Sequence, residues 1–96
     1  GLTEDVISLD PLADKWEAFG WEVLAIEDGN DIQQILTVLD EATERKGKPK
    51  IIIAETVKGK GVSFMENRAE YHGRALRPDE MDRARKELEI PGFRVE

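Results

Sequence analysis

The run Ile51, Ile52, Ile53 and Ala54 constrains the fold of this chain more than any other stretch. An unbroken β-branched run, without alternation of apolar and polar residues, is typical of a strand buried on both faces of a parallel sheet that helices cover. On such sheets, ligands bind beyond the carboxyl ends of the strands. The sequence therefore predicts an α/β fold with helices packed on a parallel sheet, and it places the functional residues downstream of Ala54.

A second strand and a helix precede the isoleucines. Residues 21–26 predict another buried strand, and residues 32 to about 46 predict a helix with one apolar face, made of Ile32, Ile35, Leu36, Leu39 and Ala42. Asn30 and Gln33 are spaced as a capping box at its start, and Asp31 adds a negative charge to the first turn. A strand, a helix and a strand in this order predict a parallel pair. Because two or three strands cannot form a covered sheet, we expect further strands outside these residues.

Shorter elements are predicted on either side of this unit. Near the amino end, a short strand or core edge is expected from Val6, Ile7 and Leu9. A helix capped by Asp10 is expected to follow and to end at Gly20, with an apolar face of Leu12, Trp16 and Phe19.

The last predicted helix begins at Pro78, with Asp79 and Glu80 at its positive end. Its apolar stripe is thin and consists of Met81, Ala84 and Leu88. Its charged residues, Arg83 among them, are expected to form a solvated face. The helix is expected to end at Pro91-Gly92, before the tail at 93–96.

Charge and composition exclude several kinds of partner. The chain carries 14 Lys and Arg against 21 Asp and Glu, a net charge of −7, which disfavours nucleic acid and anionic membranes as partners. It has no cysteine, so neither a disulfide nor a thiolate metal site can form, and this composition fits a cytoplasmic protein. No apolar run is long enough to span a bilayer. An anion would have to be bound locally.

The loop after the isoleucines holds the candidate binding residues. In Lys58-Gly59-Lys60-Gly61, the glycines permit close backbone approach and the lysines suit a phosphate, although the frame is not that of a Walker loop. Taken alone, such a turn is more often a solvated loop. His72, the single histidine, can transfer protons near neutral pH, but a lone histidine is more often hydrogen-bonded to its neighbours than catalytic.

Taken together, these stretches resemble the end of the thiamine diphosphate-binding N-terminal domain of transketolase. The matching words are PLADKWEAFGW at 11–21, DG at 28–29, TVKGKGV at 56–62, MEN at 65–67 and YHG at 71–73. In this family, the lysine of the T-x-K-G-x-G turn and the histidine of the W-H-G word reach the cofactor, and the histidine also meets the sugar. The resemblance assigns cofactor binding to Lys58 and His72, and it assigns substrate binding and a catalytic role to His72.

The resemblance also implies an activity and its cofactors. It implies transfer of a two-carbon ketol unit between sugar phosphates, in the pentose phosphate pathway, by a homodimeric enzyme that uses thiamine diphosphate and a divalent cation, Mg²⁺ or Ca²⁺. The family's metal-holding G-D-G motif and asparagine are absent from these residues. Residues 1–96 are therefore expected to be one partial domain, the distal part of the cofactor domain. We expect it to have no metal site and no tight cofactor binding of its own. The rest of the transketolase, in the same chain or in a separate one, is the expected partner.

Two alternatives and two departures accompany this interpretation. The K-G-x-G turn and a later H-G word also occur in 1-deoxyxylulose-5-phosphate synthase, although residues 15–21 are more similar to transketolase. From a different class, the chain could be a non-catalytic acidic interaction module.

Tyr71 stands where tryptophan is usual in the transketolase pattern. Arg74-Ala75-Leu76 replaces a proline-bearing continuation, and Arg74 is then an additional cation without an assigned role.

Overall fold

The structure, a computed structural model, describes residues 1–89 and divides the chain into two compact units. The N-terminal unit is Leu2–Thr56, and the C-terminal unit begins at Val57 and includes Gly1. Among the described residues, no helix is both long and apolar enough to cross a membrane.

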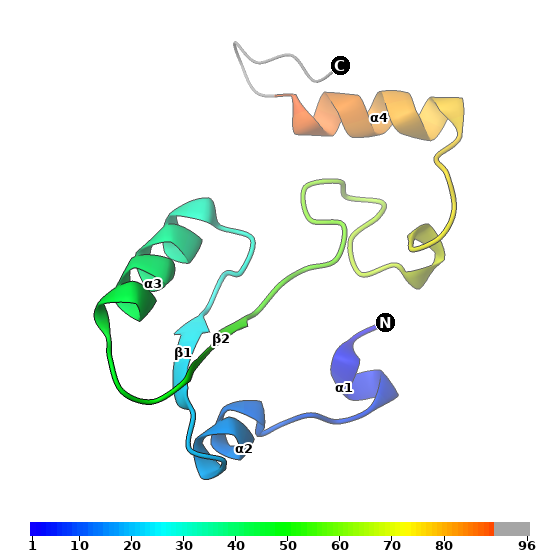
Figure 1. Ribbon diagram of the computed structural model, residues 1–96. Coiled ribbons are helices and arrows are strands. Elements are labelled where there is room, and N and C mark those ends of the chain that lie inside the picture. The colour runs from blue at the N-terminus through cyan, green and yellow to red at the C-terminus, as the bar shows by residue number, and fades with distance from the viewer. Residues whose placement is uncertain (90–96) are drawn as a thin grey trace. The chain divides into compact units, whose positions relative to one another are not determined.

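A parallel strand pair forms the centre of the N-terminal unit. The strands β1 (Glu22–Ile26) and β2 (Lys50–Ala54) pair in register from Glu22 opposite Lys50 to Ile26 opposite Ala54. Helix α3 (Ile32–Glu44) connects them and packs on β1 (Figure 1). The predicted strand–helix–strand order, the parallel pairing and the α/β class are confirmed.

Burial in this unit is less complete than the sequence predicts. Leu24 and Ile26 of β1 are buried, with 6% and 4% of their surface exposed, but the three isoleucines of β2 are only half-buried. The prediction that β2 is buried on both faces is therefore wrong for the described chain. A sheet of two strands leaves β2 at an edge, where one flank has no neighbouring strand.

The inner face of α3 is rotated from the predicted one. Its half-buried apolar residues are Ile35, Val38 and Ala42, whereas Ile32, Leu36 and Leu39 are 67%, 51% and 45% exposed. The apolar surface of α3 is wider than one two-stranded sheet can cover, so the packing on β1 selects only part of it.

The cap of α3 also differs from the predicted one. Asp31, not Asn30, is the N-cap residue, and its carboxylate accepts hydrogen bonds from the backbone N–H groups of Gln33 (2.8 Å) and Gln34 (3.4 Å). Both residues suit a cap, and the sequence spacing alone favoured the wrong one.

The residues near the amino end form neither the predicted strand nor a core edge: Val6 ends a short helix, α1 (Thr3–Val6), and Val6, Ile7 and Leu9 are 75%, 69% and 42% exposed. The Glu4 carboxylate accepts hydrogen bonds from the Ser8 hydroxyl and from the backbone N–H groups of Leu9 (2.7 Å) and Asp10 (3.1 Å), and these bonds lower the pKa of Glu4. Because Glu4 satisfies these backbone donors locally, they are not available for pairing with a strand.

Helix α2 (Leu12–Ala18) confirms the predicted helix but not all of its details. Pro11 is the N-cap residue and makes no side-chain cap, so Asp10 does not serve as predicted. Trp16 packs edge-to-face against Trp21, with ring centroids 4.9 Å apart. Phe19 lies just past the helix end and is 85% exposed, so it does not join the apolar face. Gly20 follows at φ +90°, as expected of the residue that ends a helix.

Up to residue 89, the C-terminal unit contains loops, a short 3-10 helix η1 (Ala69–Tyr71) and helix α4 (Pro78–Leu88). Helix α4 begins at Pro78, with Asp79 and Glu80 in its first turn, as predicted. Ala84 is buried, but Met81 and Leu88 are 40% and 41% exposed. The helix ends at Leu88, with Glu89 as its C-cap residue, before the predicted stop at Pro91-Gly92. That stop and the tail at 93–96 lie outside the described residues.

Candidate functional site

Lys58 and His72 lie side by side in the C-terminal unit. The Lys58 Nζ is 3.2 Å from the His72 Nδ1, although 14 residues separate them in the chain. Since an ammonium can only donate, Nδ1 accepts in this contact, and the proton of the neutral imidazole is then on Nε2. The fold thus brings the two predicted site residues together and leaves an N–H of His72 for another acceptor.

The loop that carries Lys58 depends on a glycine at position 59. Gly59 has φ +74°, and a Cβ added there would lie 2.8 Å from the Met65 carbonyl oxygen. The loop is closed by the Asn67 N–H, which donates to the Lys58 carbonyl over 2.9 Å. The Gly61 N–H donates to the Glu66 carboxylate over 3.1 Å. Gly59 and Gly61 therefore shape the turn, as the sequence predicted.

Helix α4 contacts this loop at Ser63 and Phe64. Both the N–H and the hydroxyl of Ser63 donate to the Glu87 carboxylate, and these bonds lower the pKa of Glu87. The Arg83 guanidinium lies over the Phe64 ring, 4.6 Å from its centroid. Arg83 and Glu87 are exposed, as predicted for the solvated face of α4, and they also fasten the loop.

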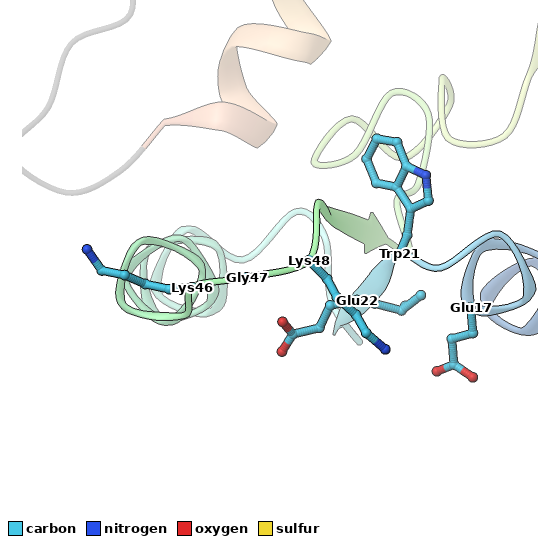
Figure 2. A pocket seen from close by; sticks show the side chains of 7 residues that line it. Glu17, Trp21, Glu22, Lys46, Gly47 and Lys48 are labelled. Atoms are coloured by element: carbon cyan, nitrogen blue, oxygen red, sulfur yellow. The ribbon is translucent and has the colours of Figure 1, made fainter.

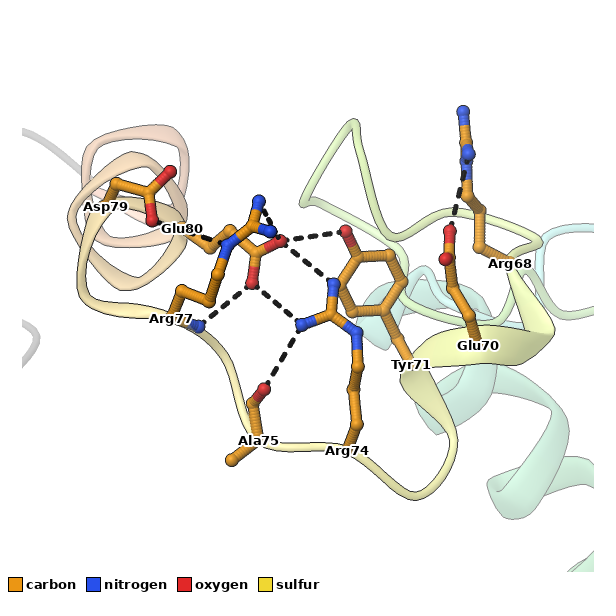
Figure 3. Close-up of polar contacts among 8 residues, drawn as sticks. All are labelled: Arg68, Glu70, Tyr71, Arg74, Ala75, Arg77, Asp79 and Glu80. Atoms are coloured by element: carbon orange, nitrogen blue, oxygen red, sulfur yellow. Dashed lines mark hydrogen bonds and ion pairs between the residues drawn. The ribbon is translucent and has the colours of Figure 1, made fainter.

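A second attachment joins α4 to the segment that carries His72. The Glu80 carboxylate accepts hydrogen bonds from the Arg74 guanidinium (2.9 and 3.1 Å) and from the Tyr71 hydroxyl (3.3 Å), as Figure 3 shows. The bonds from Arg74, followed by the bond from the Arg77 N–H, lower the pKa of Glu80 from 4.5 to about 2. Arg74, which had no assigned role in the sequence, thus pairs with Glu80, as does the Arg77 guanidinium at 3.1 Å.

Sequence reasoning missed this attachment. It placed Glu80 beside the positive end of α4, and Glu80 does accept from the Arg77 N–H over 2.9 Å. The spacing of a glutamate three residues after a helix boundary was the available signal. Nothing in the spacing indicated the contacts with Tyr71 and Arg74.

The Lys58–His72 pair can bind an anionic oxygen. The ammonium supplies a positive charge with further donors, and the imidazole supplies the Nε2–H. Because residue 59 is a glycine, its backbone lies against Met65 with no side chain between them. This donor set fits a diphosphate, the group that the resemblance implies for these residues.

Two hollows in the N-terminal unit are less suitable for an anion. One, of about 630 Å³, is lined by Glu17, Trp21, Glu22, Val23, Lys46, Gly47 and Lys48 (Figure 2). It lies where β1 and β2 begin, whereas ligands collect at the carboxyl ends of strands. The other, also about 630 Å³, does reach the ends of both strands, but its ionisable lining residues are acidic: Glu4, Asp10, Glu27 and Glu55.

Acidic side chains do not gather into a metal site in this part of the chain. Within residues 1–89, no three His, Cys, Asp or Glu side chains are grouped as a metal ion would require.

Comparison with known proteins gives a consistent result. The family model described as "Transketolase, thiamine diphosphate binding domain" matches residues 1–95. The chain is 46% identical, over 92% of its length, to an apulose-4-phosphate transketolase subunit from Actinobacillus succinogenes, of which it covers 31%. It is 40% identical, over 96% of its length, to a 6-deoxy-6-sulfo-D-fructose transketolase subunit from Clostridium sp. MSTE9, of which it covers 33%. It is also 35% identical, over 85% of its length, to transketolase 1 of Pasteurella multocida, of which it covers 14%. The chain thus spans about a third, or less, of the length of these relatives.

Proposed function

Because this chain belongs to the family of transketolase thiamine diphosphate-binding domains, we propose that it is part of an enzyme that transfers a two-carbon ketol unit between sugar phosphates. The observation that carries the proposal is the 3.2 Å contact between Lys58 and His72, the two residues that the family pattern assigns to the cofactor. When bound, thiamine diphosphate supplies the electron sink for breaking and forming the carbon–carbon bond.

Each residue of the pair has a separate task in this proposal. The Lys58 ammonium binds the diphosphate electrostatically. The His72 Nε2–H donates to a diphosphate or sugar oxygen and assists proton movement there. The contact with Lys58 supports this division, because it leaves the Nε2 side of the ring as the donor.

The remaining parts of the catalytic centre are proposed to lie elsewhere in the enzyme. Two of the relatives are named as subunits, of an apulose-4-phosphate transketolase and of a 6-deoxy-6-sulfo-D-fructose transketolase. These names support a parent enzyme assembled from more than one chain. They also support a phosphorylated or sulfonated sugar as its substrate.

Substitution of the pair in the complete enzyme tests the proposal. Lys58→Ala and His72→Ala should each weaken cofactor binding or sugar use by about 1–3 kcal/mol, the scale of a lost charge-assisted hydrogen bond. Cofactor affinity is measured by fluorescence titration with thiamine diphosphate and Mg²⁺, and sugar use by steady-state kcat/KM. Lys86→Ala, which removes an exposed lysine from α4, is the matched control and should change neither value. Unchanged kinetics and affinity in both site variants would refute the assignment.

A further inference from the structure

Glu80 makes more contacts than a helix cap requires. It is 3% exposed, and it is the one charged residue among the buried residues of the described chain. A cap at the start of α4 needs only the bond from the Arg77 N–H (2.9 Å). The bonds from Arg74 and Tyr71 come from six and nine residues earlier in the chain. Burial of a carboxylate is costly unless it is paired, so these bonds set where the earlier residues can lie.

The two distant partners of Glu80 bracket the candidate catalytic residue. Tyr71 immediately precedes His72, and Arg74 follows it by two positions. The Arg74 guanidinium also lies over the Tyr71 ring, 4.4 Å from its centroid. Residues 71–74 therefore form a small closed arch whose two ends meet at one carboxylate (Figure 3).

Within this arch, the His72 ring makes one hydrogen bond, with the Lys58 Nζ at 3.2 Å. Its side chain is exposed, and the space around Gly73 is open, since an added Cβ would meet nothing within 4 Å. Its backbone N–H donates to the Ala69 carbonyl over 3.0 Å, which fixes the backbone but not the ring. The direction of the imidazole toward Lys58 then depends on where the arch is held.

We propose that Glu80 is a positioning residue for His72: by holding Tyr71 and Arg74, its carboxylate keeps the imidazole against the Lys58 ammonium. This inference rests on the proposed function, because it matters for catalysis only if His72 meets cofactor or substrate. Glu80 itself touches neither the imidazole nor the ammonium. Its effect on the reaction passes through the arch.

A double-mutant cycle in the complete enzyme tests this role. Glu80→Gln keeps the shape of the side chain but loses the charge that pairs with Arg74. It should lower kcat/KM by roughly tenfold to a hundredfold, as expected when a functional group is displaced by up to about 1 Å. In a His72→Ala background, the same substitution should change kcat/KM by less than about twofold, since its effect passes through the missing ring.

Two further variants keep the test decisive. Asp79→Asn removes a neighbouring exposed carboxylate that contacts Arg77 but neither Tyr71 nor Arg74, and it should leave kcat/KM unchanged. Tyr71→Phe removes one hydroxyl and keeps the ring, so it should lower kcat/KM by about two- to tenfold. If Glu80→Gln fails to assemble, the cycle of Tyr71→Phe with His72→Ala replaces it.

The outcomes separate the two proposals. If Glu80→Gln lowers kcat/KM equally with and without His72, Glu80 acts on stability in general and the positioning role is overturned. The same holds if His72→Ala lowers kcat/KM but Glu80→Gln and Tyr71→Phe do not. If His72→Ala alone has no effect, the role of His72 in the proposed function is wrong, and the positioning role falls with it.

Discussion

At the scale of single residues, the local geometry depends on the absence of a side chain at Gly29 and on the burial of the Glu80 carboxylate. Gly29 is buried at the turn after β1, and its N–H donates to the Glu55 carbonyl over 2.6 Å. A Cβ at this position would lie 2.7 Å from that carbonyl oxygen and 2.9 Å from the Ala54 Cβ. The turn can therefore lie against the end of β2 only if residue 29 has no side chain.

Replacement of Gly29 by alanine should destabilise the protein. We expect the free energy of unfolding to fall by about 1–3 kcal/mol, because the backbone oxygen that the new methyl group meets cannot swing away. Gly73→Ala is the control, since its Cβ would enter open space, and it should stay within about 0.5 kcal/mol of the native value. Urea unfolding of both variants measures the difference. Equal stability of the two would contradict the close approach.

Glu80 gives a pH dependence at the same scale. Its pKa falls from 4.5 to about 2 in the folded protein, so its ionised form stabilises the fold above pH 4.5. That contribution is lost progressively as the pH falls from 4.5 through about 2, because protonation removes the charge that pairs with Arg74. The native protein should therefore have a higher Tm than Glu80→Gln at pH 6, and the difference should shrink toward pH 2.5. A difference in Tm that does not vary with pH would show that the charge of Glu80 is not responsible.

At the scale of elements, helices and strands follow from local pattern, and their ends follow from single hydrogen bonds. The periodicity of residues 32–44 predicted α3 correctly, yet the cap was assigned to Asn30. Asp31 takes that role because its carboxylate reaches two N–H groups of the first turn. The same pattern could not tell which apolar stripe of α3 would face β1, since that depends on packing.

Asp31→Ala should destabilise the N-terminal unit through loss of this cap. The expected fall in the free energy of unfolding is about 0.5–2 kcal/mol, the usual cost of removing an N-cap side chain. Asp40→Ala, in the middle of the exposed side of α3, removes the same charge without a cap and should change stability by less than about 0.5 kcal/mol. Thermal unfolding of both variants measures the difference in stability. If Asp31→Ala were no less stable than Asp40→Ala, Asp31 would not be the cap of α3.

At the scale of the whole molecule, the described chain exposes several large apolar side chains. Val6, Ile7, Phe19 and Ile32 are 67–85% exposed in the N-terminal unit. The chain spans about a third of the subunits to which it is similar. Both facts support the proposal that it functions inside a larger transketolase.

The same scale yields a prediction about the cofactor. The isolated 96-residue chain should bind thiamine diphosphate with Mg²⁺ at least about a hundredfold more weakly than the complete enzyme. The reason is that the chain offers the Lys58–His72 pair but no metal cluster within its described residues, and lost contacts of this kind cost about 3 kcal/mol. Fluorescence titration measures both affinities, with circular dichroism to verify that the chain is folded. Equal affinities would contradict a site shared with other parts of the enzyme.

The sequence by itself determined the features that neighbouring residues dictate. The isoleucine run predicted β2, helical periodicity predicted α3 and α4, and the glycines predicted the shape of the turn at Lys58. Motif words placed Lys58 and His72 as candidates. Each of these depends on backbone preference and residue spacing over a few positions, which the order of amino acids contains directly.

Only the tertiary structure decided which side chains meet. It brought Lys58 to His72, Ser63 to Glu87, and both Tyr71 and Arg74 to Glu80. These contacts join residues six to 24 positions apart, and no local spacing specifies them. A charged side chain accepts whichever donor the fold places within about 3 Å, so its partner is fixed by the path of the chain in space.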